Sequence, residues 1–463
     1  MPPVTKIIIT KLVFLILIFT FFDINLYLLK IMQKNFVDEL RWRGLINDII
    51  PDTEKVLLES SINGYIGFDP TSDSLHIGSL VQIIILMHFQ KLGHKPIILL
   101  GGATGMIGDP SGKSKERNLL DNKILQKNCQ SIKFQMEKFL DFDKNKSNSA
   151  LIVNNYEWMK DFSLVEFSRA VGKHVTVNYM MAKDSVKKRL GKHSNEGMSF
   201  TEFTYQLIQG YDFLYLFNNY NCKIQIGGSD QWGNITTGTE LIRRKNGKKA
   251  YAITCPLVKK VDGTKFGKTE EGNIWLDKKK TSSYKFYQYW LNTSDEDAFN
   301  YIKIFTLLEK ERIEKIIAEH KLNPHQRLVQ NTLANEVTLM VHGKEDLENV
   351  KIASQVLFGQ TTKDSLKNID SETFIEIFES VPNASINIDS LKKGVDIVSL
   401  LSGKTNFLKS NSEARRALKE NSISVNKLKV DESCIVSEKD LIADNCILIQ
   451  RGKKNYFLIK VIS

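Results

Sequence analysis

A strand that breaks into a turn and continues as a long apolar helix, over residues 64–92, constrains the fold of this chain more than any other stretch. The apolar residues at 65–68 predict a buried strand, and the run LVQIIILMHFQKL at 80–92 predicts a mostly apolar helix. Between them, residues 69–74 (DPTSDS) break the strand and supply candidates for the N-cap of the helix.

His76 and Gly78 lie at this strand-to-helix turn. Backbone N–H groups and the helix dipole favour an anion at such a place. A glycine lets a phosphate approach the backbone, and an imidazole can donate a hydrogen bond to a phosphate oxygen. An ordinary surface turn with one histidine is the simpler interpretation, so this motif does not decide the function by itself.

Further strands predict a doubly wound sheet of the nucleotide-binding kind. We expect strands at 95–100, 150–154 and 222–226, and helices at 36–46, 162–190 and 201–220. The glycine-rich loop at 101–114 lacks the spacing of a P-loop because Ile107 stands where a glycine is required. The strand at 222–226 runs into Gly-Gly-Ser-Asp-Gln, and strand ends followed by glycine and an acid are where such sheets bind ligands.

One face of the helix at 201–220 combines a phenol, an amide and a carboxylate. Tyr205, Gln209 and Asp212 are spaced i, i+4 and i+7, which places them on the same side of a helix. On an otherwise apolar face they indicate a pocket with a polar floor. A buried polar cluster between two helices explains the same spacing equally well.

A basic, glycine-containing loop follows at 259–269. Two of its lysines, Lys265 and Lys268, are three residues apart and can close on a triphosphate as point charges. A solvated basic hairpin is the commoner explanation of such a run.

The rest of the chain changes character twice. Residues 283–357 predict only helices, and 358–389 are polar and linker-like. The last stretch mixes a helix with short strands and carries 14 Lys and Arg against 8 Asp and Glu over residues 391–463. This net charge of +6 is more than half of the +11 of the whole chain and makes a polyanionic partner plausible.

The cysteines and histidines argue against a metal site. The five cysteines form no CxxC pair, which suits a reducing compartment, and the eight histidines form no HExxH pattern. We therefore predict neither a disulfide framework nor a structural metal.

The apolar segment at 7–29 is interrupted by Lys11, Asp23 and Asn25. A membrane anchor or a signal peptide is one interpretation, although no small-residue cleavage site follows. We favour the interpretation that Met32 is the real start and that 1–31 is a translated upstream extension, with organelle targeting as the alternative.

Together these pieces resemble the bacterial-type tyrosyl-tRNA synthetases, a class I aminoacyl-tRNA synthetase family, over residues 32–463. His76-Ile-Gly-Ser79 stands where that class has its HIGH signature, and Lys265-Phe-Gly-Lys-Thr269 where it has KMSKS. The stretches GGATGMIGDPSG at 101–112 and GGSDQWGN at 227–234 are the most specific parts of the match.

The resemblance implies an α/β fold with a Rossmann-like parallel-sheet catalytic domain over 32–257. It also implies a KFGKT loop and helical domain over 258–357, a linker over 358–390 and a small α+β RNA-binding domain over 391–463. The implied reaction is tyrosine–tRNA ligation. Tyrosine is activated with ATP to tyrosyl-adenylate and pyrophosphate, and the tyrosyl group then moves to the terminal adenosine of the tRNA.

The family's motifs imply roles for individual residues. The residues expected to stabilise the triphosphate during catalysis are His76, Ser79, Lys265, Lys268, Thr269, Lys113 and Arg117. Those expected to bind tyrosine are Tyr65, Asp109, Tyr205, Gln209, Asp212 and Gln231, with Tyr65 and Asp212 on the phenol. Those expected to bind ATP are Gly67, Asp69, Thr71, His76, Gly78, Gln225, Gly228, Asp230 and Lys268, and those expected to contact tRNA are Arg415, Arg416, Lys453 and Lys454.

The resemblance further implies Mg²⁺ accompanying ATP without a protein cage, a homodimer and a cytoplasmic location. Three departures from the family pattern put ATP affinity in question: Ser79 replaces the second histidine of HIGH, Ile66 stands where some members have a cysteine, and Gln82 stands where some have a threonine. A non-catalytic, synthetase-like RNA-binding protein is the alternative function. A nucleotidyltransferase sharing the HxG turn is a further alternative, but it would not explain the pair of residues aimed at a phenol.

Overall fold

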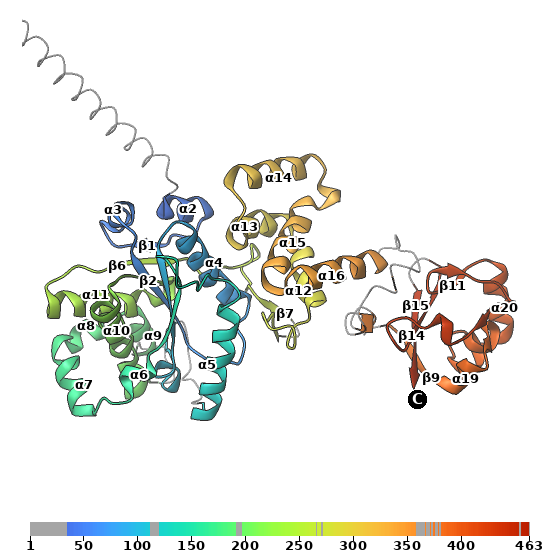
Figure 1. The fold of residues 1–463 in the computed structure, drawn as a ribbon, viewed down its shortest axis with the longest axis horizontal. Coiled ribbons are helices and arrows are strands. Elements are labelled where there is room, and N and C mark those ends of the chain that lie inside the picture. Colours follow the sequence, from blue (N-terminus) through green and yellow to red (C-terminus); the bar gives the residue numbers. More distant parts are fainter. Residues whose placement is uncertain are drawn as a thin grey trace, which may run out of the picture. The chain divides into compact units, whose positions relative to one another are not determined.

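The computed structural model describes residues 35–111, 120–190, 197–264, 266–269, 272–357, 366, 371, 374–375, 378, 381–452 and 455–462. The chain divides into two compact units, one of Met1–Gly267 with Lys303–Leu308 and one of Lys268–Ile302 with Glu309–Ser463 (Figure 1). The apolar segment 1–31 lies outside the described residues. Within the ranges just given, no helix has both the length and the apolar character needed to span a bilayer.

A six-stranded sheet forms the centre of the first unit. Its strands follow the order β1-β6-β5-β2-β3-β4, and every neighbouring pair is parallel except β1 with β6. The strands are β1 (Asp48–Ile49), β2 (Asn63–Phe68), β3 (Lys95–Leu100), β4 (Leu151–Asn154), β5 (Cys222–Gly228) and β6 (Tyr251–Cys255). This arrangement confirms the predicted α/β class.

The strand order reverses at β2, which decides where a ligand can bind. β2 pairs with β3 on one side and with β5 on the other, so that Tyr65 lies opposite both Ile97 and Gln225. In open parallel sheets a crevice forms beyond the carboxyl ends of the strands at such a switch point. The residues that follow β2 and β5 are therefore the first candidates for a binding site.

Four long helices connect the strands: α4 (Ile77–Lys91), α5 (Asn122–Met136), α10 (Phe200–Tyr220) and α11 (Trp232–Asn246). α4 is apolar around most of its circumference, and its middle residues are fully buried, as expected for a helix covered on several sides. α10 and α11 pack along each other. The shorter elements of this unit are α2 (Phe36–Arg43), α3 (Thr53–Glu59), η1 (Thr104–Met106), α6 (Tyr156–Met159), α7 (Leu164–Ala170), η2 (Gly172–His174), α8 (Val177–Met181), α9 (Asp184–Leu190) and η3 (Ser229–Gln231).

Three predictions about these helices need correction. The helix predicted over 36–46 ends at Arg43 because Gly44 adopts φ +74°, a left-handed cap. The helix predicted over 162–190 is broken into α7, α8 and α9, with Ser163 and Thr176 capping the first two. No residue of 69–74 caps α4, because His76 does so with its own imidazole.

The second unit begins with the hairpin of β7 (Lys268–Thr269) and β8 (Gly272–Asn273). The all-helical prediction for 283–357 is confirmed. The helices are α12 (Ser283–Leu291), α13 (Asp295–Phe305, whose last turn belongs to the first unit), α14 (Lys310–Leu322), η4 (Pro324–Gln326), α15 (Leu328–His342) and α16 (Lys344–Leu357).

The C-terminal part of this unit is built on a five-stranded sheet of order β12-β11-β14-β15-β9. Its strands are β9 (Asn383–Asn387), β11 (Ile423–Val425), β12 (Leu428–Lys429), β14 (Cys446–Arg451) and β15 (Asn455–Ile462), beside the pair β10 (Val395–Asp396) and β13 (Ile435–Val436). The helical elements are α19 (Ile388–Lys392), η5 (Ser399–Lys404), α20 (Asn411–Lys419) and η6 (Glu438–Asp440).

β9 lies inside the stretch predicted as a linker over 358–390, and that part of the prediction is wrong. The strand runs parallel to β15, and Phe374 and Phe378 upstream of it are fully buried in the same apolar cluster as Leu448 and Leu458. The sequence NASIN conceals the strand because Ile386 is its only buried residue.

Candidate active site

A buried carboxyl, that of Asp212 on α10, lies at the base of the site. Its side chain accepts hydrogen bonds from Asn155 Nδ2 at 2.9 Å and Trp158 Nε1 at 2.8 Å. Burial raises the pKa of Asp212 to about 7, and these two hydrogen bonds oppose the rise. Burial also raises the pKa of the Tyr65 phenol on β2, with the charge of Asp212 as the next cause, so the two groups lie within electrostatic reach of each other.

The two donors to Asp212 were not predicted. Asn155 follows the end of β4, and besides Asp212 it contacts Thr104 Oγ1 at 3.1 Å and the Ala103 N–H at 2.7 Å. Trp158 comes from the short helix α6. The only signal in the sequence is that both follow a predicted strand end.

A second polar cluster is centred on Asp69, directly after β2. Asp69 Oδ2 accepts from the Tyr205 hydroxyl at 2.8 Å, and Oδ1 accepts from Thr104 Oγ1 at 2.7 Å. Burial raises the pKa of Tyr205 well above its ordinary value, with the charges of Asp69 and Asp109 as further causes. Gln231 Nε2 donates to Asp109 Oδ2 at 2.6 Å. The ends of β2 and β5 thus share one polar region with α10 and the loop after β3.

Three buried polar atoms in this region have no hydrogen-bond partner within the described part of the chain: the Tyr65 hydroxyl, Gln209 Oε1 and Gln225 Oε1. They come from β2, α10 and β5, the elements around the switch point. A buried polar group without a partner costs about 1–3 kcal/mol, so such atoms are expected where a ligand supplies the partner.

The HIGH-type turn (residues 76–79) forms the N-terminus of α4. His76 Nδ1 accepts from the Gly78 N–H at 3.0 Å. In the neutral ring Nδ1 is then the acceptor and Nε2 carries the proton. A Cβ at Gly78 would lie 2.7 Å from His76 Cε1, so the close approach requires glycine.

The residues at the three departures are placed as follows. Ser79 lies in the first turn of α4, Ile66 is buried within β2, and Gln82 Nε2 donates to Cys255 Sγ at 3.2 Å. Two other expected ATP positions lie in more open surroundings. A Cβ at Gly67 would meet nothing within 4 Å, and Thr71 is exposed in the turn after β2.

The KFGKT signature (residues 265–269) is described in part. The Phe266 ring stacks on Phe305, with 5.0 Å between ring centroids, and a Cβ at Gly267 would lie 3.0 Å from Ile77 Cγ1. This end of the signature therefore lies against the first residue of α4. Lys268 and Thr269 form β7 in the second unit. The expected catalytic residues Lys265, Lys113 and Arg117 lie outside the described residues.

The remaining expected positions follow β5. Gly228 is the last residue of β5 and is buried, whereas Asp230 is half-buried in η3. Asp230 contributes to the pKa of Cys255, which burial raises to about 11. Throughout the described ranges, no three His, Cys, Asp or Glu side chains are grouped as ligands for a metal ion.

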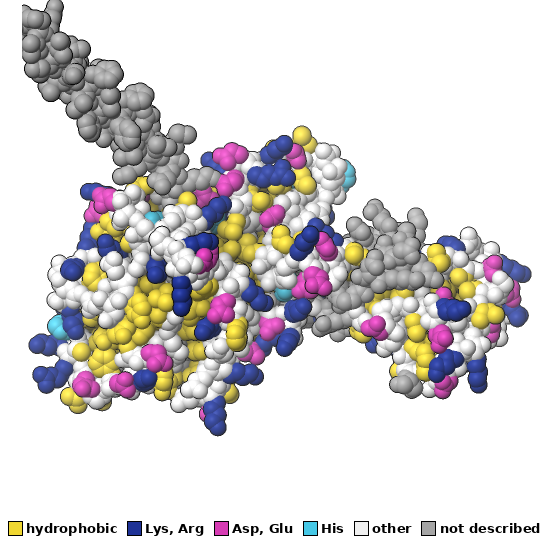
Figure 2. All heavy atoms as spheres, viewed as in Figure 1, with side chains coloured by type: hydrophobic (Ala, Val, Ile, Leu, Met, Phe, Trp, Pro, Cys, Tyr) yellow, Lys and Arg dark blue, Asp and Glu magenta, His cyan; other side chains and the backbone are white. Residues whose placement is uncertain are grey.

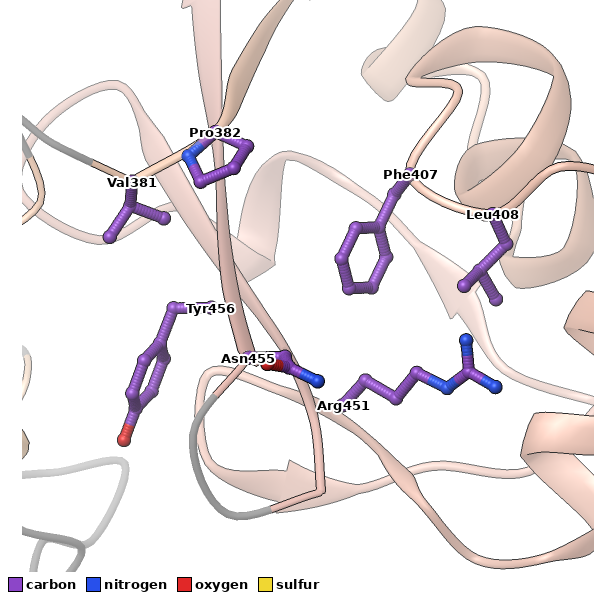
Figure 3. A pocket seen from close by; sticks show the side chains of 7 residues that line it. All are labelled: Val381, Pro382, Phe407, Leu408, Arg451, Asn455 and Tyr456. Atoms are coloured by element: carbon purple, nitrogen blue, oxygen red, sulfur yellow. The ribbon is translucent and has the colours of Figure 1, made fainter.

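The expected tRNA contacts lie in the C-terminal part of the second unit. Arg415 pairs with Glu432 at 2.8 Å and remains largely exposed, and Arg416 lies in the last turn of α20. Lys453 and Lys454 are outside the described residues. This part contains a hollow of about 370 Å³. The side chains that line it, drawn in Figure 3, are Val381, Pro382, Phe407, Leu408, Arg451, Asn455 and Tyr456.

A sheet with a reversed strand order, an HxG turn at the start of the helix that follows β2, and a basic signature beside that turn define a class of nucleotide-using enzyme. Residues 58–359 match the family described as "tRNA synthetases class I (W and Y)", and the chain belongs to that family. Residues 373–459 match the family described as "Tyrosine--tRNA ligase SYY-like C-terminal domain".

The relatives agree on the particular enzyme. A protein of Flavobacterium psychrophilum named tyrosine–tRNA ligase is 60% identical over 431 residues, which cover 93% of this chain and 100% of the relative. One of Bacteroides fragilis with the same name is 56% identical over 426 residues, which cover 92% and 99%. These relatives confirm the resemblance to bacterial tyrosyl-tRNA synthetases.

A solved structure agrees on the fold. A C-terminally truncated mitochondrial tyrosyl-tRNA synthetase of Aspergillus nidulans is similar with a TM-score of 0.63 and 32% identity. The match covers 70% of this chain and 94% of that one.

Proposed function

We propose that this chain is a tyrosine–tRNA ligase. It activates L-tyrosine with ATP, releasing pyrophosphate, and transfers the tyrosyl group from the adenylate to a ribose hydroxyl of the terminal adenosine of its tRNA. The observation that carries the proposal is the set of buried, unpartnered polar atoms of Tyr65, Gln209 and Gln225, which come from the elements around the switch point. A phenol and an ammonium group on one small molecule would supply the missing partners.

The phenol of the substrate donates to Asp212 and accepts from the Tyr65 hydroxyl. Phenylalanine would leave the buried Tyr65 hydroxyl without a partner and would offer Asp212 no donor beyond those of Asn155 and Trp158. A site built to hydrogen-bond a substrate hydroxyl rejects the analogue that lacks it, and tyrosine–tRNA ligases are themselves the standard example of this rule. The α-ammonium group is held by Asp109, Tyr205 and Gln209, with Gln231 beside Asp109 at 2.6 Å.

Activation requires positioning and charge stabilisation more than proton transfer. The tyrosine carboxylate attacks the α-phosphorus, a new P–O bond forms, and the bond to pyrophosphate breaks with its electron pair on the leaving oxygen. No general base is needed because a carboxylate is already ionised at pH 7. ATP lies over the ends of β2 and β5, with Mg²⁺ entering on the triphosphate oxygens. The residues around the nucleotide are Gly67, Asp69, Thr71, His76, Gly78, Gln225, Gly228, Asp230 and Lys268.

Charge on the leaving pyrophosphate is stabilised by the Nε2–H of His76 and by the cations of the KFGKT signature. The hydrogen bond from Gly78 to Nδ1 supports this role because it leaves Nε2 as the donor. The full proposed set is His76, Ser79, Lys265, Lys268, Thr269, Lys113 and Arg117.

The tRNA is held by the C-terminal part of the second unit through phosphate contacts, which position RNA without reading its sequence. Arg415, Arg416, Lys453 and Lys454 are the proposed contacts. The proposed domains are a catalytic domain, a helical domain and a C-terminal RNA-binding domain, and the last of these begins before β9.

The enzyme acts as a homodimer in the cytoplasm. Large apolar side chains stand exposed at the starts of helices in the first unit, among them Leu164 of α7 at 73% and Phe200 of α10 at 74%. Figure 2 shows hydrophobic side chains gathered on the visible face of this unit. A second copy would cover such a surface, and sedimentation equilibrium of the full chain tests this.

The decisive assay of function is amino-acid-dependent exchange of pyrophosphate into ATP, with each standard amino acid offered in turn. We expect exchange with tyrosine alone. Exchange that depends on another amino acid would contradict the assignment, and no exchange with any of them would favour the non-catalytic alternative.

A further inference from the structure

We propose that Arg43 is a positioning residue for the KFGKT signature. It acts through the segment Lys303–Leu308 and the stacked rings of Phe305 and Phe266. The inference rests on the proposed function, because it concerns the loop that binds the triphosphate. Nothing in the HIGH or KFGKT motifs points to Arg43, which is about 220 residues away from the signature in sequence.

Arg43 is the last residue of α2 and is 2% exposed. Its guanidinium donates to three backbone carbonyls of one short segment: Lys303 O at 2.5 Å, Thr306 O at 2.7 Å and Leu308 O at 2.7 Å. Its Nε donates to Glu39 Oε1 at 2.8 Å, so its charge is balanced within α2. Burial lowers the pKa of Arg43, and Glu39 opposes that shift.

The three carbonyls explain why an arginine is required. They lie at and just beyond the C-terminus of α13, where the last carbonyls of a helix lack intrahelical partners and the dipole is negative. A planar fork of five donors can reach all three at once and still bind Glu39. A lysine has one ammonium group and cannot span them.

The segment that Arg43 binds contains Phe305, which connects it to the KFGKT signature. Its side chain is fully buried and stacks on Phe266 at 5.0 Å with 20° between the rings. The neighbouring Gly267 lies against Ile77, the residue after His76. One continuous series of contacts therefore leads from Arg43 to the place where the KFGKT signature meets the HIGH-type turn.

All these groups belong to the first unit, which contains both Gly267 and the segment Lys303–Leu308. The chain enters and leaves that segment from the second unit, so backbone continuity with α2 or with the sheet does not hold it in place. Three hydrogen bonds from Arg43 join the backbone of the segment to α2. Loss of the guanidinium fork should let the segment shift, and Phe266 with it.

The test compares Arg43→Lys and Phe305→Leu with Arg327→Lys as the matched control. Arg327 likewise donates to two backbone carbonyls, Leu291 O at 2.8 Å and Thr293 O at 3.0 Å, and neither acceptor belongs to the KFGKT signature or to the segment Lys303–Leu308. For each full-length variant we would measure tyrosine-dependent pyrophosphate exchange as a function of ATP, the Kd for tyrosine, and the Tm.

We expect Arg43→Lys and Phe305→Leu each to lower kcat for exchange by about 10-fold or more, because a displacement on the order of 1 Å can cost up to about 100-fold. The Kd for tyrosine should stay within about twofold, and Arg327→Lys should exchange as the wild type does. The double variant should lose no more than the worse single variant, since both changes interrupt one series of contacts.

A parallel loss of tyrosine binding and of exchange would overturn the inference, since it would indicate general damage. Multiplicative losses in the double variant would also overturn it. If Arg43→Lys does not fold, Phe305→Leu carries the test alone. Absence of exchange in the wild-type chain would overturn the proposed function and this inference together, whereas normal exchange in both variants would overturn the inference only.

Discussion

The carboxyl of Asp212 is set between two opposing influences. Burial favours its neutral form, while the donors Asn155 and Trp158 favour the carboxylate, and the result is a pKa of about 7 in the ligand-free chain. Near neutral pH the group is therefore only partly ionised. This balance makes the stability of the folded chain depend on pH.

The sign of the stability effect follows from the two pKa values. The unfolded chain loses this proton near the ordinary value of 3.8, whereas the folded chain keeps it up to about 7. The stability that the group contributes is fully present below the lower value and is lost as pH rises toward the upper one, by up to about 1.4 kcal/mol per pH unit. We expect the free energy of unfolding of the ligand-free wild type to fall more steeply over this window than that of Asp212→Asn.

Denaturant titrations at several pH values would measure these slopes. The comparison uses slopes and not absolute stabilities. The new amide in Asp212→Asn would place its N–H₂ group against a donor, either Asn155 Nδ2 or Trp158 Nε1, and this lowers stability for a separate reason. Parallel slopes would show that Asp212 ionises normally in the folded chain.

Replacing Tyr65 or Tyr205 with phenylalanine should have opposite effects on the stability of the ligand-free chain. Tyr65→Phe removes a buried hydroxyl without a partner, so the ligand-free chain should be as stable as the wild type or up to about 1 kcal/mol more stable, while tyrosine binding weakens. Tyr205→Phe removes the donor to Asp69 at 2.8 Å and should destabilise the ligand-free chain by about 1 kcal/mol or more. Unfolding curves and tyrosine titrations of both variants test this, and equal losses of stability would contradict it.

Among the elements, the N-terminus of α4 depends on the fit between the imidazole of His76 and Gly78. In Gly78→Ala the new Cβ would lie 2.7 Å from the ring and displace it. We expect a loss of about 10-fold or more in the ATP-dependent rate of exchange, with tyrosine affinity unchanged. Gly172→Ala is the control, because a Cβ there meets nothing within 4 Å. A similar small effect in both variants would argue against the role of His76.

Much of this architecture could be predicted from local pattern. The strand at 95–100 coincides with β3, and the spacing of Tyr205, Gln209 and Asp212 placed them on one helix face. Asn155 and Trp158 were missed because their contact with Asp212 spans more than 50 residues and follows no motif. The cap of α4 was missed because Ser, Thr, Asp and Asn are the residues usually found at an N-cap. Here the N-cap is His76, whose Nδ1 accepts a hydrogen bond from the Gly78 N–H.

At the scale of the whole molecule, the position of β9 decides where the C-terminal part can be removed. Ending the chain at Leu357 should spare tyrosine-dependent exchange and abolish charging of tRNA. Ending it at residue 390 would remove β15, the partner of β9, and would expose Phe374 and Phe378. We therefore expect the longer fragment to aggregate, which light scattering would detect. Charging by the shorter fragment would contradict the proposed role of the C-terminal part.

The first unit is discontinuous in sequence, because the six residues Lys303–Leu308 return to it after an excursion of 35 residues, Lys268–Ile302. A gene cut after Gly267 would encode the entire central sheet and still yield an incomplete protein. Phe266 would lose its stacking partner, and the buried guanidinium of Arg43 would face water in place of three carbonyls. The smallest fragment that can be expected to activate tyrosine must therefore continue to at least Leu308, so the helical region cannot be exchanged between relatives as a simple C-terminal cassette.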